Sequence, residues 1–129
     1  MQAFRSFLKS ALLSLTAVVF SAQLSQAQQT PAPAKSGNEE VKIKTSAVCG
    51  MCKARLEKAL AYEKGVQAAL LDVPSQVLTV QYRAGKTTPE ALRAAVVATG
   101  YDADGQTAND KAYNRLPECC KKTNAIHGD

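Results

Sequence analysis

The chain has 129 residues and a formal net charge of +5 at pH 7. This length accommodates one domain, and the charges alternate along the sequence instead of forming the basic stripe with interleaved aromatic residues that is typical of nucleic-acid binding. Disulfides are not required for folding, because a chain of this length can bury a core without them.

Residues 1–27 have the parts of a secretory signal peptide. A short positive region precedes an apolar run over residues 11–20, and Ser25-Gln26-Ala27 places small residues at the positions that a signal peptidase reads. The apolar run is shorter than the ~20 residues of a membrane-spanning helix, which argues against a membrane anchor. We therefore expect cleavage after Ala27 and a mature protein in the periplasm or secreted from the cell.

Folded structure is expected after a linker. Residues 28–39 are rich in Gln, Pro, Ala, Ser and Gly and lack periodic apolar positions, which predicts a flexible segment before a domain at residues 40–107. The alternation in Val41-Lys42-Ile43-Lys44-Thr45 predicts a half-buried strand. Residues 52–64 change to helical spacing, and Gly65 provides a helix stop.

Two further strands and a second helix follow. The strands are predicted at residues 66–73 and 77–82, and the second of them has a strongly β-forming composition. Pro89 suits the first position of a helix, and Thr87 and Glu90 have capping-box spacing.

The last predicted element of this unit is a short strand. Gly100 ends the second helix, and residues 101–107 indicate a weaker fourth strand. The order strand, helix, strand, strand, helix, strand predicts an α+β fold in which a four-stranded antiparallel sheet carries both helices on one face.

Cys49-Gly50-Met51-Cys52 is the stretch with the clearest chemistry. It lies where the strand pattern gives way to the helix pattern, and a thiolate at a helix N-terminus has its pKa lowered by unpaired backbone N–H groups and by the helix dipole. The spacing lets both sulfurs converge on one ion, and thiolates select soft metals, Cu(I) foremost and Zn(II) with further help. A soft metal site and a redox disulfide both fit this motif.

The surrounding residues resemble a known family. Residues 45–65 (TSAVCGMCKARLEKALAYEKG), the VLTVQY strand and Thr99-Gly100-Tyr101 are similar to the heavy-metal-associated domain of copper chaperones, metal pumps and mercury-binding proteins. The resemblance covers about residues 40–107. It implies a ferredoxin-like βαββαβ fold and an aromatic residue, Tyr101, near the site.

The resemblance also implies a function. Cys49 and Cys52 would bind Cu(I) or Hg(II) in two-coordinate geometry and pass the ion by thiol exchange to a partner, such as a membrane metal transporter or an acceptor metal-binding domain. One departure leaves the metal open: Ala47 stands where the family usually has Met. Met51 is either a thioether neighbour of the metal or an exposed loop residue.

Two competing interpretations use the same cysteines. A thiol–disulfide oxidoreductase of the thioredoxin type usually has Pro before the second Cys, where this chain has Met51, and it requires more elements than are predicted here. A structural disulfide module is the other, because four cysteines in an oxidising compartment allow three pairings.

The tail at residues 108–129 lies beyond the family module and contains Cys119 and Cys120. Either these cysteines form disulfides, with each other or with the first pair, or they fold back as additional ligands of a three- or four-sulfur site for Zn(II) or clustered Cu(I). Tyr113 and Leu116, at i,i+3 spacing, are candidate anchors for the tail.

No catalytic constellation is visible in the sequence. There is no Ser-His-Asp set, phosphate loop or paired carboxylates at useful spacing, and the single histidine, His127, is a weak ligand candidate in a polar C-terminus. We therefore expect an exported, monomeric metal-binding protein and not an enzyme. The choice between chaperone and scavenger, and between copper, mercury and zinc, stays open.

Overall fold

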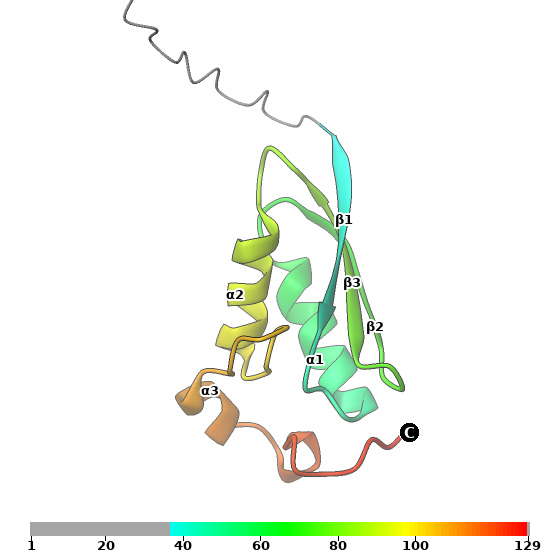
Figure 1. Ribbon diagram of the computed structural model, residues 1–129, viewed down its shortest axis with the longest axis vertical. Helices are drawn as coiled ribbons and strands as arrows, with labels where there is room; N and C mark the ends of the chain where they lie inside the picture. Colours follow the sequence, from blue (N-terminus) through cyan, green and yellow to red (C-terminus); the bar gives the residue numbers. More distant parts are fainter. Residues whose placement is uncertain (1–36, 129) are drawn as a thin grey trace, which may run out of the picture. The chain divides into compact units, whose positions relative to one another are not determined.

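The computed structural model describes residues 37–128, so the predicted signal peptide and most of the predicted linker lie outside the described residues. Figure 1 shows the elements in chain order. They are β1 (Asn38–Lys44), α1 (Gly50–Ala61), β2 (Val66–Asp72), β3 (Val77–Arg83), α2 (Pro89–Thr99), α3 (Asp110–Asn114) and a short 3-10 helix, η1 (Glu118–Cys120). Across this described stretch, no helix is long and apolar enough to cross a bilayer.

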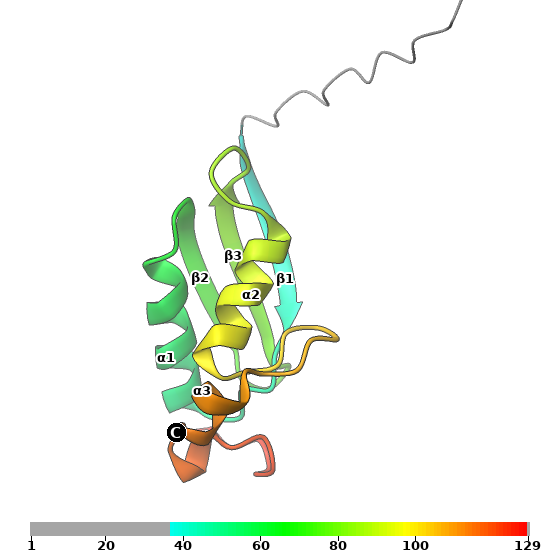
Figure 2. The same ribbon diagram turned by 90° about the vertical axis from the view of Figure 1, so that its left-hand side faces the viewer.

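The sheet is antiparallel, with β3 between β1 and β2. Ile43 on β1 pairs with Leu78 on β3, and both side chains are fully buried, as the alternation of apolar and polar residues predicts. Figure 2 shows α1 and α2 side by side on one face of this sheet. The predicted helix placement is therefore confirmed, and the core lies between the helices and the sheet.

Helix α1 is fixed against the edge strand β2 by polar contacts. The Glu57 carboxylate accepts a hydrogen bond from the Leu71 amide at 2.8 Å, and the Lys53 ammonium donates to the Leu71 carbonyl at 2.8 Å. These contacts satisfy backbone groups of an edge strand, which would otherwise be open to pairing with another chain. They also fix the first turns of α1, which begin beside Cys49.

The helix ends follow local chemistry. Helix α1 begins at Gly50, two residues before the predicted start, because the Cys49 sulfur caps it by accepting a hydrogen bond from the Cys52 amide. Thr88 caps α2 through the Ala91 amide, so the capping-box prediction that used Thr87 was wrong by one residue. Helix α2 ends as predicted at Gly100, which has a φ of +107°.

The predicted fourth strand does not form. In residues 101–107 only isolated bridges occur, from Ala103 to Thr45 and to Gln106, so the described sheet has three strands instead of four. The chain turns back here because Asp104 adopts a φ of +51°. The Asp104 backbone N–H donates to the Lys44 carbonyl, and its carboxylate accepts from the Lys44 amide, which ties this turn to the end of β1.

Replacing Asp104 with Asn is expected to lower stability modestly at neutral pH. The hydrogen bond from Arg93, and then that from the Lys44 amide, lower the pKa of Asp104 below its ordinary value. Its stabilising effect is therefore complete above the unfolded-state pKa, about 4, and is lost as pH falls through the lower folded-state pKa. Because the ion pair between Arg93 and Asp104 is partly exposed and screened by solvent, we expect the free energy of unfolding to fall by about 0.5–1 kcal/mol at pH 7.

Asn tolerates the same left-handed backbone, so the comparison isolates the charge. Urea denaturation of both proteins at pH 7 and at pH 3 measures the effect. The difference between Asp104→Asn and the parent should shrink at the lower pH, and a difference that is equal at both values would contradict this account.

Candidate metal centre

The two motif cysteines meet at the start of α1. Cys49 is the N-cap residue and Cys52 lies in the first turn, which brings their sulfur atoms to 3.0 Å from each other. Both side chains are buried, Cys49 at 2% and Cys52 at 0% exposure. The capping geometry therefore produces the convergence of sulfurs that the spacing predicts.

The tail brings the second cysteine pair to the same place. The Cys120 sulfur lies 3.8 Å from that of Cys49 and 4.0 Å from that of Cys119. The sulfurs of Cys49, Cys119 and Cys120 all lie within 4.8 Å of one another, and all four cysteines are free thiols. The tail therefore folds back onto the motif cysteines, as both the additional-ligand alternative and a disulfide with the first pair require.

The closing tail, residues 108–128, makes apolar contacts with the core. Leu116 is 4% exposed and Tyr113 packs beside it against the core, as their spacing predicted. The α3 backbone also comes very close to Gly100: a Cβ atom there would lie 3.0 Å from the Ala112 carbonyl carbon. The sequence did not predict α3, although Asn109, which caps it through the Ala112 amide, is a typical start signal.

Polar contacts hold the closing tail at two further points. The Lys122 ammonium pairs with the Asp102 carboxylate at 3.0 Å, and the His127 amide donates to the Val48 carbonyl at 2.8 Å. The latter bond crosses the loop that leads into Cys49. The imidazole of His127 contacts the Ala125 carbonyl instead, and it is not part of the sulfur cluster.

The thiols differ in acidity. Burial alone raises the pKa of Cys52, but hydrogen bonds from the Cys49 thiol and the Val48 amide outweigh it and lower the pKa. Burial raises the pKa of Cys49, and donation of its S–H to Cys52 raises it further. Burial likewise raises the pKa of Cys120, reinforced by its contacts with Cys52 and Cys49. Cys52 is thus the most acidic of these three thiols, with Cys49 as a neighbouring donor.

Tyr101 lies beside this cluster, as the resemblance implied. It is fully buried, and its hydroxyl is an unpaired buried polar group within residues 37–128. Burial raises the pKa of Tyr101, and the adjacent Cys52 and Cys120 sulfurs raise it further, so the hydroxyl keeps its proton and can donate it.

Ala47 and Met51 take the two positions that bear on metal identity. Ala47 is fully buried and accepts a hydrogen bond from the Gln76 amide group at its carbonyl. Met51 is 54% exposed, yet its sulfur lies 3.7 Å from that of Cys119. Met51 is therefore both an exposed residue and a thioether neighbour of the cluster.

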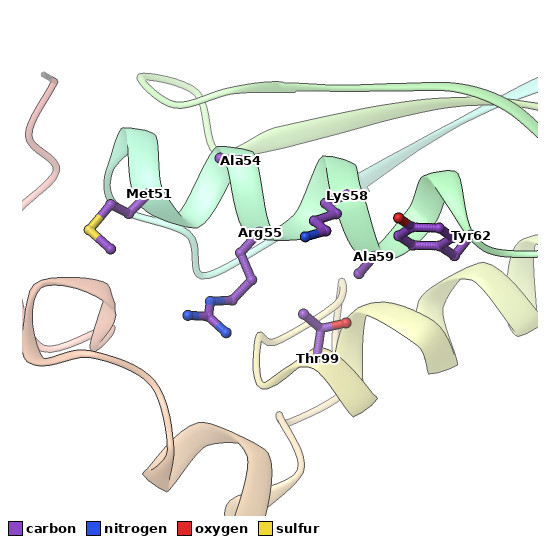
Figure 3. Close-up of a pocket in the computed structure, with 7 residues that line it drawn as sticks. All are labelled: Met51, Ala54, Arg55, Lys58, Ala59, Tyr62 and Thr99. Carbon is purple, nitrogen blue, oxygen red and sulfur yellow. The ribbon is translucent and has the colours of Figure 1, made fainter.

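An open groove begins beside Met51 and runs along α1 toward the end of α2. Figure 3 shows Met51 at its end nearest the closing tail, with the Arg55 and Lys58 side chains along it. The groove is lined by Met51, Ala54, Arg55, Lys58, Ala59, Tyr62 and Thr99. Its positive side chains, Arg55 and Lys58, follow Met51 along α1.

The fold and the site define a small α+β domain with a cluster of soft sulfur donors at one helix N-terminus. Residues 42–102 match the heavy-metal-associated domain, which confirms the resemblance. This part of the chain is similar to that family. The match ends before Cys119 and Cys120, so the second cysteine pair lies outside it.

Individual proteins are similar over the same region. A copper-exporting P-type ATPase of Staphylococcus epidermidis is 31% identical over 78 residues, which are 60% of this chain and 10% of the ATPase. The chain thus spans about a tenth of the length of that relative. Oxidised MerP from Ralstonia metallidurans is 20% identical with a TM-score of 0.51, over 53% of this chain and 96% of MerP, and it supports the fold.

A CopZ metallochaperone is 27% identical with a TM-score of 0.49, over 50% of this chain and 98% of CopZ. The match of residues 42–102 to the heavy-metal-associated domain agrees with the β-α-β-β-α order of the described elements.

Proposed function

We propose that this protein binds one soft metal ion through Cys49 and Cys52, for transfer or sequestration. Cu(I) and Hg(II) fit the donors best, and Zn(II) is the third candidate. The predicted signal peptide supports action in the periplasm or outside the cell. Single-step binding of a cargo ion requires no catalytic group from the chain.

The observation that carries this proposal is the convergence of two buried sulfurs at 3.0 Å on a helix N-terminus. The pKa of Cys52 is lowered and that of Cys49 is raised, so Cys52 is the thiol of the pair that loses its proton more readily to an arriving cation. Binding releases the thiol protons, because a metal-bound cysteine is deprotonated. The family match supports the same use of this position.

The partner is a membrane metal transporter or another protein with a metal-binding domain. The similarity to part of a copper-exporting ATPase supports a transporter. The positive side chains of Arg55 and Lys58, in the groove that begins at Met51, would favour an acceptor with an acidic surface.

The alternative is a thiol–disulfide redox protein. The closeness of the Cys49 and Cys52 sulfurs favours it, since cysteines three apart at a helix start can also form a reactive disulfide. This activity would show as reduction of insulin disulfides by the metal-free protein.

Purification without oxygen, followed by metal and thiol analysis, tests the proposal. We expect one equivalent of Cu(I), and a loss of affinity in Cys49→Ser larger than the roughly 10- to 100-fold that removal of an outer-shell partner causes. Ala61→Ser, an exposed change at the end of α1, is the control and should bind like the parent. Failure to bind Cu(I), Hg(II) or Zn(II), together with insulin reduction, would establish the redox alternative.

A further inference from the structure

We propose that the closing tail supplies Cys120 as a third sulfur ligand to the ion held by Cys49 and Cys52. We further infer that the closing tail must lift before a partner can take that ion. Both statements rest on the proposed function. They add a third sulfur ligand to the two-cysteine site, and they add a tail that covers the bound ion.

The position of Cys120 carries the first step. Its side chain is 1% exposed, and its sulfur lies 3.8 Å from that of Cys49 although 71 residues separate them. The Cys49 sulfur is thus the shared neighbour of the Cys52 sulfur, at 3.0 Å, and of the Cys120 sulfur, which approaches the motif pair from the Cys49 side. A buried cysteine is often only a small apolar residue of the core, but this one faces two other thiols.

The unpaired hydroxyl of Tyr101 is a second and independent observation. It is completely buried beside Cys52 and Cys120, with no hydrogen-bond partner among residues 37–128. Buried hydroxyls are usually paired, and outer-shell groups around metal sites usually donate to a ligand atom. When Cys52 and Cys120 bind an ion as thiolates, their sulfurs become strong acceptors for this hydroxyl.

The closing tail covers the face that ligand exchange requires. A partner's thiol must reach the ion, but Cys49 is 2% exposed and the His127 amide is bonded to Val48 just before it. The cover is nonetheless reversible. Its ion pair between Lys122 and Asp102 is partly exposed and therefore weak, so Leu116 carries much of the attachment.

Cys119 lies at the edge of the site. Its sulfur is within 4.8 Å of those of Cys49 and Cys120, and it touches the exposed thioether of Met51. Cys119 is thus able to replace Cys120 when that residue alone is removed. A decisive variant must remove both tail thiols.

The first test measures the Cu(I) environment by X-ray absorption and the affinity by competition with a chromophoric chelator. We expect three sulfur ligands in the reduced parent protein and two in Cys119→Ser/Cys120→Ser, with an affinity lower by about tenfold or more. An X-ray absorption spectrum that shows only two sulfur ligands around Cu(I) in the parent protein would overturn the proposal. This measurement does not depend on how any variant folds.

The same test separates this inference from the proposed function. If the double variant binds like the parent while Cys49→Ser loses Cu(I), the two-cysteine site stands and the third ligand is refuted. If Cys49→Ser/Cys52→Ser, which lacks both motif thiols, keeps its Cu(I), the proposed function itself has failed.

The second test addresses the closing tail as a cover. Leu116→Ala keeps all four cysteines but removes the buried anchor, so Cu(I) should pass to an excess of chelator about tenfold faster or more. Lys111→Ala, an exposed change on α3, is the control and should match the parent rate. Equal rates in Leu116→Ala and the parent would show that the closing tail does not limit release.

Discussion

Replacing Leu56 with alanine is expected to lower the free energy of unfolding by about 2–5 kcal/mol. Leu56 is fully buried, one helical turn after Cys52, in the layer where α1 packs on the sheet. The change removes apolar contacts and leaves a cavity that the rigid surroundings fill only in part. Since domains of this size are stable by about 5–15 kcal/mol, the loss is a large share of the total.

Urea denaturation of the reduced, metal-free protein measures this loss. Lys58→Ala is the matched control, because it lies on the exposed side of the same helix and should stay within about 0.5 kcal/mol of the parent. Saturation of Leu56→Ala with Cu(I) should restore about 2.7 kcal/mol when free metal is 100 times its Kd. A similar loss in both variants would contradict the assigned core.

The sequence allowed the ordered part of the fold to be predicted where the signals are local. Alternation in residues 41–45 and the β-forming composition of residues 77–82 predicted two strands, and Gly100 marked the end of α2. Helix α1 ends at Ala61, before the predicted stop at Gly65. The prediction of a strand at residues 101–107 was wrong because the conformation there depends on contacts between residues that are not neighbours in sequence. Asp104 reaches Lys44 and Arg93, which are distant in sequence, and these contacts stabilise a turn where a strand was expected.

The candidate site likewise has a part that local sequence signals predict and a part that they do not. Cys49 and Cys52 are three residues apart, so their meeting follows from one helical turn and was predictable. The return of Cys120 depends on packing far along the chain, and the sequence left it as one of two alternatives. Leu116 gave a usable signal through its spacing from Tyr113, whereas nothing local indicated that the Tyr101 hydroxyl would be unpaired.

Gly100→Ala is expected to destabilise the protein by about 1–3 kcal/mol and to loosen the closing tail. The residue has a φ of +107°, a backbone conformation that costs this much for a residue with a Cβ atom. The new Cβ would also lie 3.0 Å from the Ala112 carbonyl carbon, so α3 must move away. Both effects act at the junction between α2 and the closing tail.

The loosening can be measured directly, because Cys120 is 1% exposed in the closed form. In the reduced, metal-free Gly100→Ala protein, a thiol reagent should label Cys120 faster than in the parent. Gly105→Ala is the matched control: its φ is not positive and a Cβ there meets no atom within 4 Å, so stability and labelling should be unchanged or slightly improved. If Gly100→Ala is destabilised but its Cys120 stays as protected as in the parent, the cost lies in the backbone of α2 alone, and the closing tail docks independently of Gly100.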